Sequence, residues 1–282
     1  MSFAIIGNGF VGQATKILKT KDTKMLIYDI DPQKCDPPGT TLKDLDQCNI
    51  IFISVPTPMD KNGRNHLGIV QSVVQKLKQT IDTSKSHLVI RSTVLPGTCD
   101  ELDCYFMPEF LTEKNWDYDF RHCENWFFGL KNNNNSDFKD KITEIFNNAY
   151  KSGNIKHNHI TFVKNKEAEM IKYFRNTFLS VKVSFCNEIY DYCQKKNIDY
   201  NTVQQLATLD KRITSSHTQV PGHDGRRGFG GTCFPKDTNA LLKEFDDNNI
   251  DSYILKAAVE RNEKVDRPEK DWNLDKGRAV IS

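Results

Sequence analysis

A glycine-rich turn near the start of the chain restricts its possible folds more than any other feature. Gly7, Gly9 and Gly12 have the spacing G-x-G-x-x-G, directly after an apolar segment at residues 3–6 and at the start of a helical pattern that extends to residue 18. A second apolar segment, at residues 24–30, carries Asp29 near its end, 17 residues beyond the last glycine. This order predicts a dinucleotide-binding βαβ unit.

Each position of this pattern has its own physical role. Gly7 allows the tight turn, Gly9 lets the backbone approach a pyrophosphate, and Gly12 lets the helix pack on the strand. Asp29 is predicted to accept a hydrogen bond from a ribose hydroxyl, with Asp31 as the alternative. A carboxylate there repels a 2′-phosphate, so the pattern favours NAD over NADP. The expected cofactor-binding residues are Gly7, Gly9, Phe10, Val11, Gly12, Asp29, Lys34, Thr57 and Thr93.

The next part of the chain alternates between strand and helix patterns. Apolar runs recur at residues 50–55, 87–91, 104–107 and 126–130, with helical patterns at residues 67–81 and 136–150. Such alternation predicts a parallel, doubly wound sheet. Thr57 and Thr93 follow two of its strands, at the edge where such sheets bind ligands, although Thr57 is equally well explained by an ordinary proline turn. The asparagine run at residues 132–135 is predicted to be a surface loop.

Helical patterns dominate from residue 167 onward. One long amphipathic helix is predicted over residues 167–196, with an apolar stripe formed by Ile171, Phe174, Phe178, Val181, Phe185 and Ile189. Lys172 and Asn176 are four residues apart and flank this stripe, where they could hold and polarise a hydroxyl group. A lysine on a helix could also be an ordinary solvated residue. Further helices are predicted at residues 200–209, 238–248 and 253–264.

A cysteine stands in a glycine-rich segment late in the chain. Residues 228–237 read Gly-Phe-Gly-Gly-Thr-Cys-Phe-Pro-Lys-Asp, so Lys236 and Asp237 follow closely after Cys233. A nearby ammonium favours the thiolate, and a carboxylate can orient water or accept a proton. A cysteine in a loop can also be simply a small buried hydrophobe. Upstream, Arg226 or Arg227 could clamp a phosphate, or could belong to a solvated face.

Composition excludes several classes of protein. The 282 residues include 39 basic and 37 acidic ones, which implies neither a nucleic-acid partner nor a membrane surface. No apolar run approaches the about 18 residues that span a bilayer, and we expect a soluble, cytoplasmic protein. The eight cysteines lack zinc-site spacing and are expected to be reduced, with no metal bound.

Taken together, these motifs resemble the nucleotide-sugar dehydrogenase family, which includes UDP-glucose and GDP-mannose dehydrogenases. The resemblance covers nearly the whole chain in order. It comprises the glycine fingerprint from Gly7, Val55-x-Thr57-Pro58, residues 92–98, residues 108–111, the Lys172 and Asn176 pair, and the cysteine segment. The resemblance implies an NAD-dependent oxidation of a sugar primary alcohol to a carboxylate, with UDP-glucose favoured as the substrate by Phe234.

The resemblance also implies roles for individual residues. Cys233 would capture the aldehyde intermediate as a thiohemiacetal that becomes a thioester, while Lys172 stabilises oxyanions and Asn176 positions the sugar. Such covalent capture suits this oxidation, because removing four electrons takes two NAD molecules and the aldehyde must not escape between them.

Four further residues are implied to act on water and on charge. Asp237 and Glu109 would assist water activation or proton transfer, Thr93 would hold the water, and Lys236 would aid the same charge. The residues implied to contact substrate are Glu109, Phe110, Leu111, Lys172, Asn176, Arg227, Phe229 and Gly230.

The chain departs from the family pattern in places. Met107 and Lys114 stand where the family usually has asparagine and glycine, near the segment that normally holds the substrate diphosphate. The expected organisation is an NAD-binding domain at residues 1–165, a helical domain at residues 166–265 that forms a homodimer through its long helix, and a linker at residues 266–282. The last residues resemble the first strand of a third domain, cut short.

Two alternatives remain open at this point. A two-electron hydroxyacid dehydrogenase would share the glycine fingerprint and the helical Lys-x-x-x-Asn pair, but has no catalytic thiol. A truncated chain that binds NAD or a full-length partner without catalysis is the other, and the presence of Cys233, Lys236 and Asp237 together argues against it.

Overall fold

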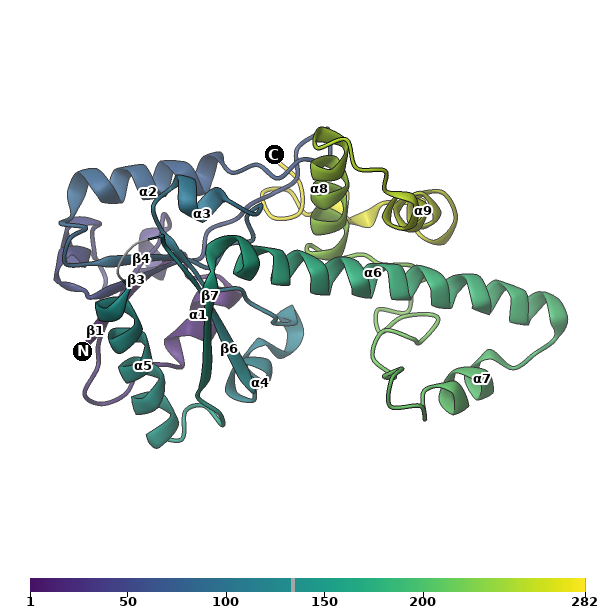
Figure 1. Ribbon diagram of the computed structural model, residues 1–282, viewed down its shortest axis with the longest axis horizontal. Coiled ribbons are helices and arrows are strands. Elements are labelled where there is room, and N and C mark those ends of the chain that lie inside the picture. The colour runs from purple at the N-terminus through teal and green to yellow at the C-terminus, as the bar shows by residue number, and fades with distance from the viewer. Residues whose placement is uncertain (133–134, 282) are drawn as a thin grey trace. The chain divides into compact units, whose positions relative to one another are not determined.

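The computed structural model describes residues 1–132 and 135–281 (Figure 1). The middle of the predicted asparagine loop, Asn133 and Asn134, and the last residue of the predicted terminal strand, Ser282, lie outside the described residues. The chain divides into two compact units. The first is Met1–Thr57 with Leu67–Lys172, and the second is Pro58–His66 with Tyr173–Ser282.

The described part of the first unit contains a seven-stranded sheet with the strand order β2-β1-β3-β4-β5-β6-β7. The strands are β1 (Ser2–Ile6), β2 (Lys24–Tyr28), β3 (Ile50–Ile53), β4 (His87–Ile90), β5 (Tyr105–Phe106), β6 (Asn125–Leu130) and β7 (His159–Lys164). The predicted strands are all present, and the predicted α/β fold class is confirmed.

The expectation of a wholly parallel sheet is wrong at one pair of strands. Phe106 of β5 pairs with Gly129 of β6 in the antiparallel sense, while β6 and β7 are parallel to each other. The α-helix between β5 and β6 has only six residues, whereas parallel neighbours are usually joined by a longer helical crossover.

Helices cover both faces of this sheet. They are α1 (Phe10–Lys16), α2 (Gly68–Thr80), α3 (Thr98–Glu101), α4 (Trp116–Arg121) and α5 (Ser136–Lys151). Successive strand residues point to opposite faces. Phe3 and Ile5 of β1 therefore join the core beneath α1, α4 and α5, while Ala4 and Ile6 join the core beneath α2 and α3. Figure 1 shows these two groups of helices on opposite faces of the sheet. This arrangement leaves the carboxyl ends of β1, β3 and β4 as the edge from which the predicted ligand loops emerge.

The helices of the second half are α6 (Asn165–Lys196), α7 (Tyr200–Ala207), α8 (Phe234–Asp247) and α9 (Tyr253–Arg261). The predicted long helix is confirmed as α6, which has 32 residues and whose first turns belong to the first unit. Within the second unit its buried face is built of small and polar residues, among them Asn176, Ser180 and Ser184. The stripe residues Phe174 and Phe178 are instead about 60% exposed, at 63% and 60%.

The segment after α9 folds back within the second unit. Asn262–Asp266 form a π-helical turn and Asp271–Leu274 a 3-10 helix. Trp272 and Ala279 pack with Met59, whose N–H donates to the Ala279 carbonyl over 2.8 Å. The terminal strand expected from the sequence is not formed among residues 277–281, because Val280 makes only isolated bridges, to Met59 and Lys276.

None of the helices in the described residues combines the length and apolar character needed to cross a bilayer.

Candidate active site

The glycine-rich turn has a conformation that only glycine tolerates at two of its three positions. Gly7 has φ +89°, and a Cβ there would lie 2.4 Å from the Ser54 carbonyl oxygen. A Cβ on Gly12 would lie 2.0 Å from the Gly7 carbonyl oxygen, because α1 crosses close to the turn. A Cβ on Gly9 would meet nothing within 4 Å. Gly7 and Gly12 thus close the turn, while the backbone at Gly9 faces open space.

Asp29 lies directly against this turn, one residue after the end of β2. One of its carboxylate oxygens accepts from the Asn8 N–H over 2.7 Å, and the other accepts from the Asp31 N–H over 2.9 Å. Asp31 instead caps the 3-10 helix Pro32–Lys34 and pairs with Lys34 over 3.6 Å. Of the two acids considered for the ribose, the geometry favours Asp29.

The loops after β3 and β4 are tied together. The Ser92 hydroxyl accepts from the Val55 N–H over 3.0 Å and donates to the Val55 carbonyl over 2.7 Å. Thr57 is buried, and Thr93 is half-buried directly after Ser92. The predicted cofactor residues Thr57 and Thr93 therefore lie on two loops of the first unit that are held in register.

These residues of the first unit fit NAD. The open space at Gly9 admits a pyrophosphate, and the Asp29 carboxylate keeps acceptor capacity beyond its two backbone donors. Phe10 and Val11 begin α1 beside the turn, and the Lys34 carbonyl accepts from the Asn8 side chain over 2.7 Å. Asn8 of the glycine-rich turn is thus hydrogen-bonded both to Asp29 and to the backbone at Lys34.

A buried ion pair links the segment after β5 to α6 within the first unit. The Lys172 ammonium donates to the Glu109 carboxylate over 2.6 Å and to the Glu109 carbonyl over 2.8 Å. Both side chains are less than a tenth exposed. The second Glu109 oxygen accepts from the Leu111 N–H over 2.9 Å, and the Phe110 ring centroid lies 5.9 Å from the ammonium. The solvated alternative for Lys172 is therefore wrong.

Cys233 does not lie within a loop but at the start of a helix. It is the residue before the first turn of α8, which begins at Phe234, four residues earlier than predicted. Pro235 occupies the first turn, where its missing N–H costs no hydrogen bond. The glycine-rich loop ends with Gly231, at φ +72°, and Lys236 and Asp237 belong to the helix.

Asp237 is the centre of a buried cluster in the second unit. One of its oxygens accepts from the Asn176 amide over 2.6 Å, and the other accepts from the Lys236 ammonium over 2.5 Å. Its own N–H donates to the Cys233 carbonyl over 2.9 Å. Asn176 and Lys236 are each 7% exposed and Asp237 is fully buried. The first turn of α8 therefore places a paired carboxylate next to the cysteine.

Four of the other cysteines are poor candidates for a nucleophile. Burial raises the pKa of the Cys48 thiol to about 11 and that of Cys104 to about 12. Burial also raises the pKa of Cys99 and Cys186. No disulfide links cysteines in the described part of the chain, and Cys233 is half-buried. Within the same described residues, no group of three or more His, Cys, Asp or Glu side chains is placed to hold a metal ion.

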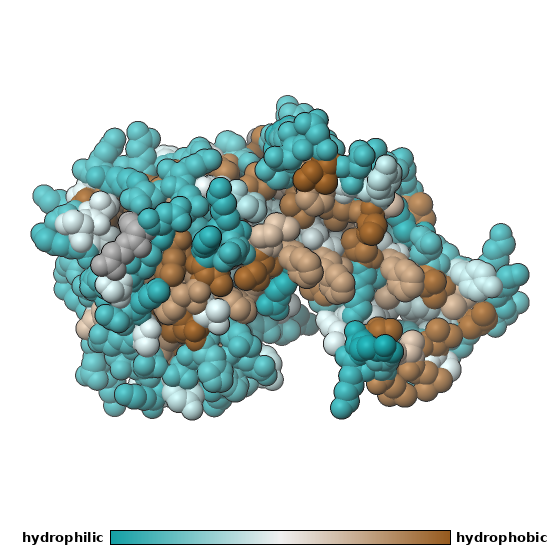
Figure 2. All heavy atoms as spheres, viewed as in Figure 1, coloured by the Kyte–Doolittle hydropathy of each residue, from teal (hydrophilic) through white to brown (hydrophobic). Residues whose placement is uncertain are grey.

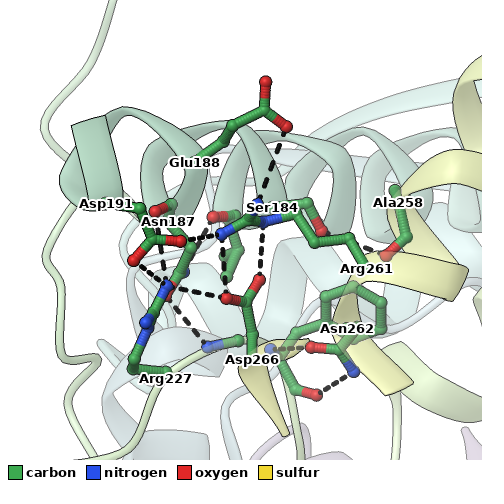
Figure 3. A network of polar contacts seen from close by, with 12 residues as sticks. Ser184, Asn187, Glu188, Asp191, Arg227, Ala258, Arg261, Asn262 and Asp266 are labelled. Atoms are coloured by element: carbon green, nitrogen blue, oxygen red, sulfur yellow. Dashed lines mark hydrogen bonds and ion pairs between the residues drawn. The ribbon is translucent and has the colours of Figure 1, made fainter. Parts of the chain in front are cut away.

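Three residues expected to contact substrate are engaged within the second unit. The Arg227 guanidinium pairs with Asp191 over 2.7 Å and with Asp266 over 2.8 Å, as Figure 3 shows. Phe229 is buried, and Gly230 lies against the guanidinium of Arg267. Because the Arg227 guanidinium is already paired with two carboxylates, we leave it out of the substrate site proposed below.

The sequence did not point to the residues that hold this loop. Asn262 and Arg267 lie where a helix was expected to give way to a linker, and neither belongs to a recognisable motif. Their partners, Phe229 and Asp224, are more than 30 residues away in sequence. No local spacing could have revealed them.

A glycine-rich turn that opens a doubly wound sheet, with an acid directly after the second strand, defines the class of dinucleotide-binding proteins. Residues 39–150 match the NAD binding domain of the UDP-glucose/GDP-mannose dehydrogenase family, and residues 166–264 match the central domain of the same family. The chain belongs to this family.

Individual relatives agree with this assignment. The chain is 29% identical over 259 residues to a UDP-glucose 6-dehydrogenase of Rickettsia bellii. The aligned region covers 88% of this chain and 57% of the relative. It is 28% identical to UDP-glucose 6-dehydrogenase YwqF of Bacillus subtilis, over 93% of this chain and 66% of that protein. The structure of a UDP-glucose dehydrogenase from Pyrobaculum islandicum has the same fold, with a TM-score of 0.78 and 23% identity over 93% of this chain and 68% of that chain. The chain thus spans between about half and two thirds of the length of these relatives.

Proposed function

We propose that this chain catalyses the NAD-dependent four-electron oxidation of a nucleotide sugar, with UDP-glucose as the favoured substrate and UDP-glucuronate as the product. The observation that carries the proposal is the arrangement at the start of α8. There Cys233 begins the helix, and the buried Asp237 one turn later is held by Asn176 and Lys236. A simple hydride-transfer dehydrogenase needs no thiol at this place, whereas an oxidation that continues past the aldehyde does.

Cys233 is the nucleophile in this proposal. Its Sγ adds to the carbonyl carbon of the aldehyde to form a thiohemiacetal, which loses a hydride from carbon and the proton of its hydroxyl group to become a thioester. Water then attacks the thioester carbon, the acid leaves and the thiol is regenerated. NAD, when bound, accepts one hydride in each of the two oxidations. The start of α8 suits this role, because the N–H groups of a helix N-terminus stabilise a thiolate.

Asn176 and Asp237 position the reacting groups in this scheme. The Asn176 amide is fixed by Asp237, so it presents its remaining donor and its carbonyl in one orientation to a sugar hydroxyl. Asp237 accepts a proton from the water that attacks the thioester, with Lys236 balancing its charge.

Lys172 and Glu109 supply charge in the first unit. The buried Lys172 ammonium is assigned to the developing oxyanions, and Glu109 to proton transfer, with Thr93 holding water. The low polarity around a buried pair strengthens each of these interactions compared with water.

We further propose a homodimer formed through α6. The stripe residues Phe174, Phe178 and Phe185 are 63%, 60% and 62% exposed in the single chain. The first two rings are stacked with their centroids 6.3 Å apart. Hydrophobic side chains gather along α6 on the face shown in Figure 2. A contiguous apolar face of this kind on a helix is typical of a surface that another protein covers.

The decisive experiment measures NADH yield. The purified chain is incubated with NAD and, in turn, UDP-glucose, UDP-N-acetylmannosamine and GDP-mannose. The expected result is two NADH per UDP-glucose consumed, with turnover abolished in Cys233→Ala. Cys123→Ala, which removes another half-buried thiol, serves as the matched control and should retain turnover.

The other outcomes decide between the alternatives. One NADH per substrate, together with insensitivity to iodoacetamide, would indicate a two-electron hydroxyacid dehydrogenase. NAD binding by calorimetry without turnover on any nucleotide sugar would contradict the proposal and favour a chain that binds NAD without catalysis.

A further inference from the structure

The loop that leads to Cys233 is covered by a segment to which the proposed reaction gives no role. This segment comprises the π-helical turn Asn262–Asp266 and the residue that follows it, Arg267. It lies in the second unit together with the loop, and Asn262, Asp266 and Arg267 are all less than a tenth exposed. Buried polar side chains of this kind persist when they have specific partners.

Asn262 binds the loop backbone at a single residue. Its Oδ1 accepts from the Phe229 N–H over 2.8 Å, and its Nδ2 donates to the Phe229 carbonyl over 2.9 Å. One side chain therefore satisfies both polar backbone groups of a residue four positions before Cys233. Figure 3 shows this paired contact beside the ionic network of Arg227, Arg261 and Asp266.

Arg267 lies flat against the next residue of the loop. Its guanidinium donates to Asp271 over 2.7 and 2.8 Å and to Asp224 over 2.6 Å. A Cβ on Gly230 would come within 2.3 Å of the Arg267 Cζ. The two carboxylates thus hold the guanidinium in a plane that leaves room for glycine alone at position 230.

The loop also has a second attachment, to α6. The Asn187 Oδ1 accepts from the Gly228 N–H over 3.3 Å and from the Arg227 Nε over 3.2 Å. Arg227 and Arg261 share the carboxylate of Asp266, so the π-helical turn and the loop are tied through one acid (Figure 3).

These contacts offset the conformational entropy that the glycine-rich loop loses when it is ordered. Gly228 and Gly231 adopt φ +67° and +72°, values that glycine reaches easily, and a chain rich in such residues loses much entropy when it is ordered. The glycines admit the turn but do not hold it. The rigid support comes from the side chains on either side of it.

We propose that Asn262 and Arg267 are positioning residues for Cys233: they fix the backbone of Phe229 and Gly230 and thereby set where the thiol at the start of α8 is presented. The inference rests on the proposed function, because it gives these residues a part in the reaction assigned to Cys233. Neither residue is assigned a contact with the substrate. A displacement of about 1 Å at a reacting atom is enough to lower a rate about a hundredfold, so support of this kind affects chemistry and not only stability.

The first test compares Asn262→Ala and Arg267→Lys with the wild type. Arg267→Lys keeps the charge near Asp224 and Asp271 but loses the planar group over Gly230. Lys264→Gln is the matched control, since Lys264 lies in the same turn, is exposed and pairs with Glu260 over 3.3 Å. The readouts are kcat, KM for the nucleotide sugar, NAD affinity, the thermal midpoint, and the pH profile of iodoacetamide alkylation of the peptide that contains Cys233, followed by mass spectrometry.

Both loop variants are expected to lower kcat by about tenfold or more, with NAD affinity unchanged, and to shift the pH profile of Cys233 alkylation. Lys264→Gln is expected to match the wild type in every readout. Loss of thermal stability with an unchanged alkylation profile and unchanged kcat would overturn the proposal, because the contacts would then be structural only. Alkylation needs no substrate, so it tests the positioning even if no nucleotide sugar is turned over and the proposed function fails.

A second test uses the steric relation between Arg267 and Gly230. Gly230→Ala is made in the wild type and in Arg267→Ala, and the Cys233 alkylation rate is measured in all four proteins. If the guanidinium occupies the space beside Gly230, the substitution should impair the wild type more than the Arg267→Ala background. Equal effects in the two backgrounds would contradict the inference. This comparison remains informative if one of the single variants is poorly folded, since it asks whether removing the arginine relieves the added methyl group.

Discussion

At the scale of single residues, each unit contains a candidate cluster built from charges that are buried away from water. Lys172 and Glu109 form one buried pair, and Lys236 and Asp237 form another. Burying an ion costs several kcal/mol, which is offset only if its hydrogen bonds are satisfied. Each of these carboxylates therefore carries additional donors, the Leu111 N–H on Glu109 and the Asn176 amide on Asp237. Such arrangements are common where a charge must act on a ligand.

His87, a histidine outside the candidate site, allows the effect of burial to be tested through the pH dependence of stability. Burial lowers the pKa of the His87 imidazole, which packs edge-on against the stacked rings of Tyr105 and Phe138, although its hydrogen bond to Asp137 acts in the opposite direction. The His87 imidazole therefore binds a proton more readily in the unfolded chain than in the folded chain. The contribution of His87 to stability is present above its usual pKa of about 6.5 and is lost as the pH falls below it.

We therefore expect the wild type to lose more thermal stability than His87→Gln between about pH 7.5 and about pH 5.5. The measurement is the unfolding midpoint by calorimetry across this range. His122→Gln removes an exposed histidine and should keep the wild-type slope. Parallel curves for the wild type and His87→Gln would show that the imidazole is not disfavoured in its charged form.

At the scale of elements, the glycine-rich turn and the start of α8 show how far local patterns can be read. The turn between β1 and α1 was predicted correctly, because its glycines are required by the backbone geometry of a few neighbouring residues. The start of α8 was placed four residues late, because glycines and a proline resemble a continuing loop. In the structure Pro235 stands in the first turn, a position that suits proline in a helix. The proline that marks the start of this helix is present in the sequence, but proline is equally typical of a turn.

Substitution by alanine is expected to have opposite effects on stability at Gly9 and at Gly12, the two glycines that flank Phe10 and Val11. Gly12→Ala places a methyl group 2.0 Å from a backbone oxygen, so we expect a loss of stability of about 1–3 kcal/mol or more. Gly9→Ala meets no atom within 4 Å, so stability should change by less than about 0.5 kcal/mol.

NAD affinity separates the two roles further. The methyl group of Gly9→Ala occupies the space proposed for the pyrophosphate, and we expect NAD affinity to fall by at least about tenfold, or about 1.4 kcal/mol. Calorimetric titration and thermal unfolding of both variants are the measurements. A Gly9→Ala variant that binds NAD like the wild type would exclude this space as the pyrophosphate site.

At the scale of the whole molecule, α6 has an unusual distribution of side chains. The face buried within the second unit is polar, and its small residues let other helices approach closely, as the hydrogen bond of 3.1 Å from Thr238 on α8 to Ser180 shows. The three phenylalanines of the predicted stripe, Phe174, Phe178 and Phe185, are exposed instead. Helical periodicity located both faces, but it could not tell which face the chain itself covers.

This exposure leads to a prediction about assembly. If a second copy covers the stripe, Phe178→Glu should weaken dimerisation by more than about tenfold, because burying a phenylalanine contributes about 1.5–3 kcal/mol. Sedimentation velocity at several concentrations measures this. Tyr118→Glu, which alters another exposed aromatic residue outside the stripe, should sediment like the wild type. A wild type that remains a monomer at every concentration would contradict the proposed dimer.

Local sequence patterns were sufficient to predict the features whose partners are near neighbours: the strand, glycine turn and helix at the start of the chain, the long helix, and the place of the cysteine beside a lysine and an aspartate. Tertiary structure decided which of these residues contact one another. Lys172 and Glu109 are 63 residues apart, and Asn176 and Asp237 are 61 apart. Arg267 covers Gly230 only because the segment after α9 folds back. A local pattern is constrained by backbone geometry within a few residues, whereas a distant pair is selected by the packing of the whole chain, which no spacing in the sequence records.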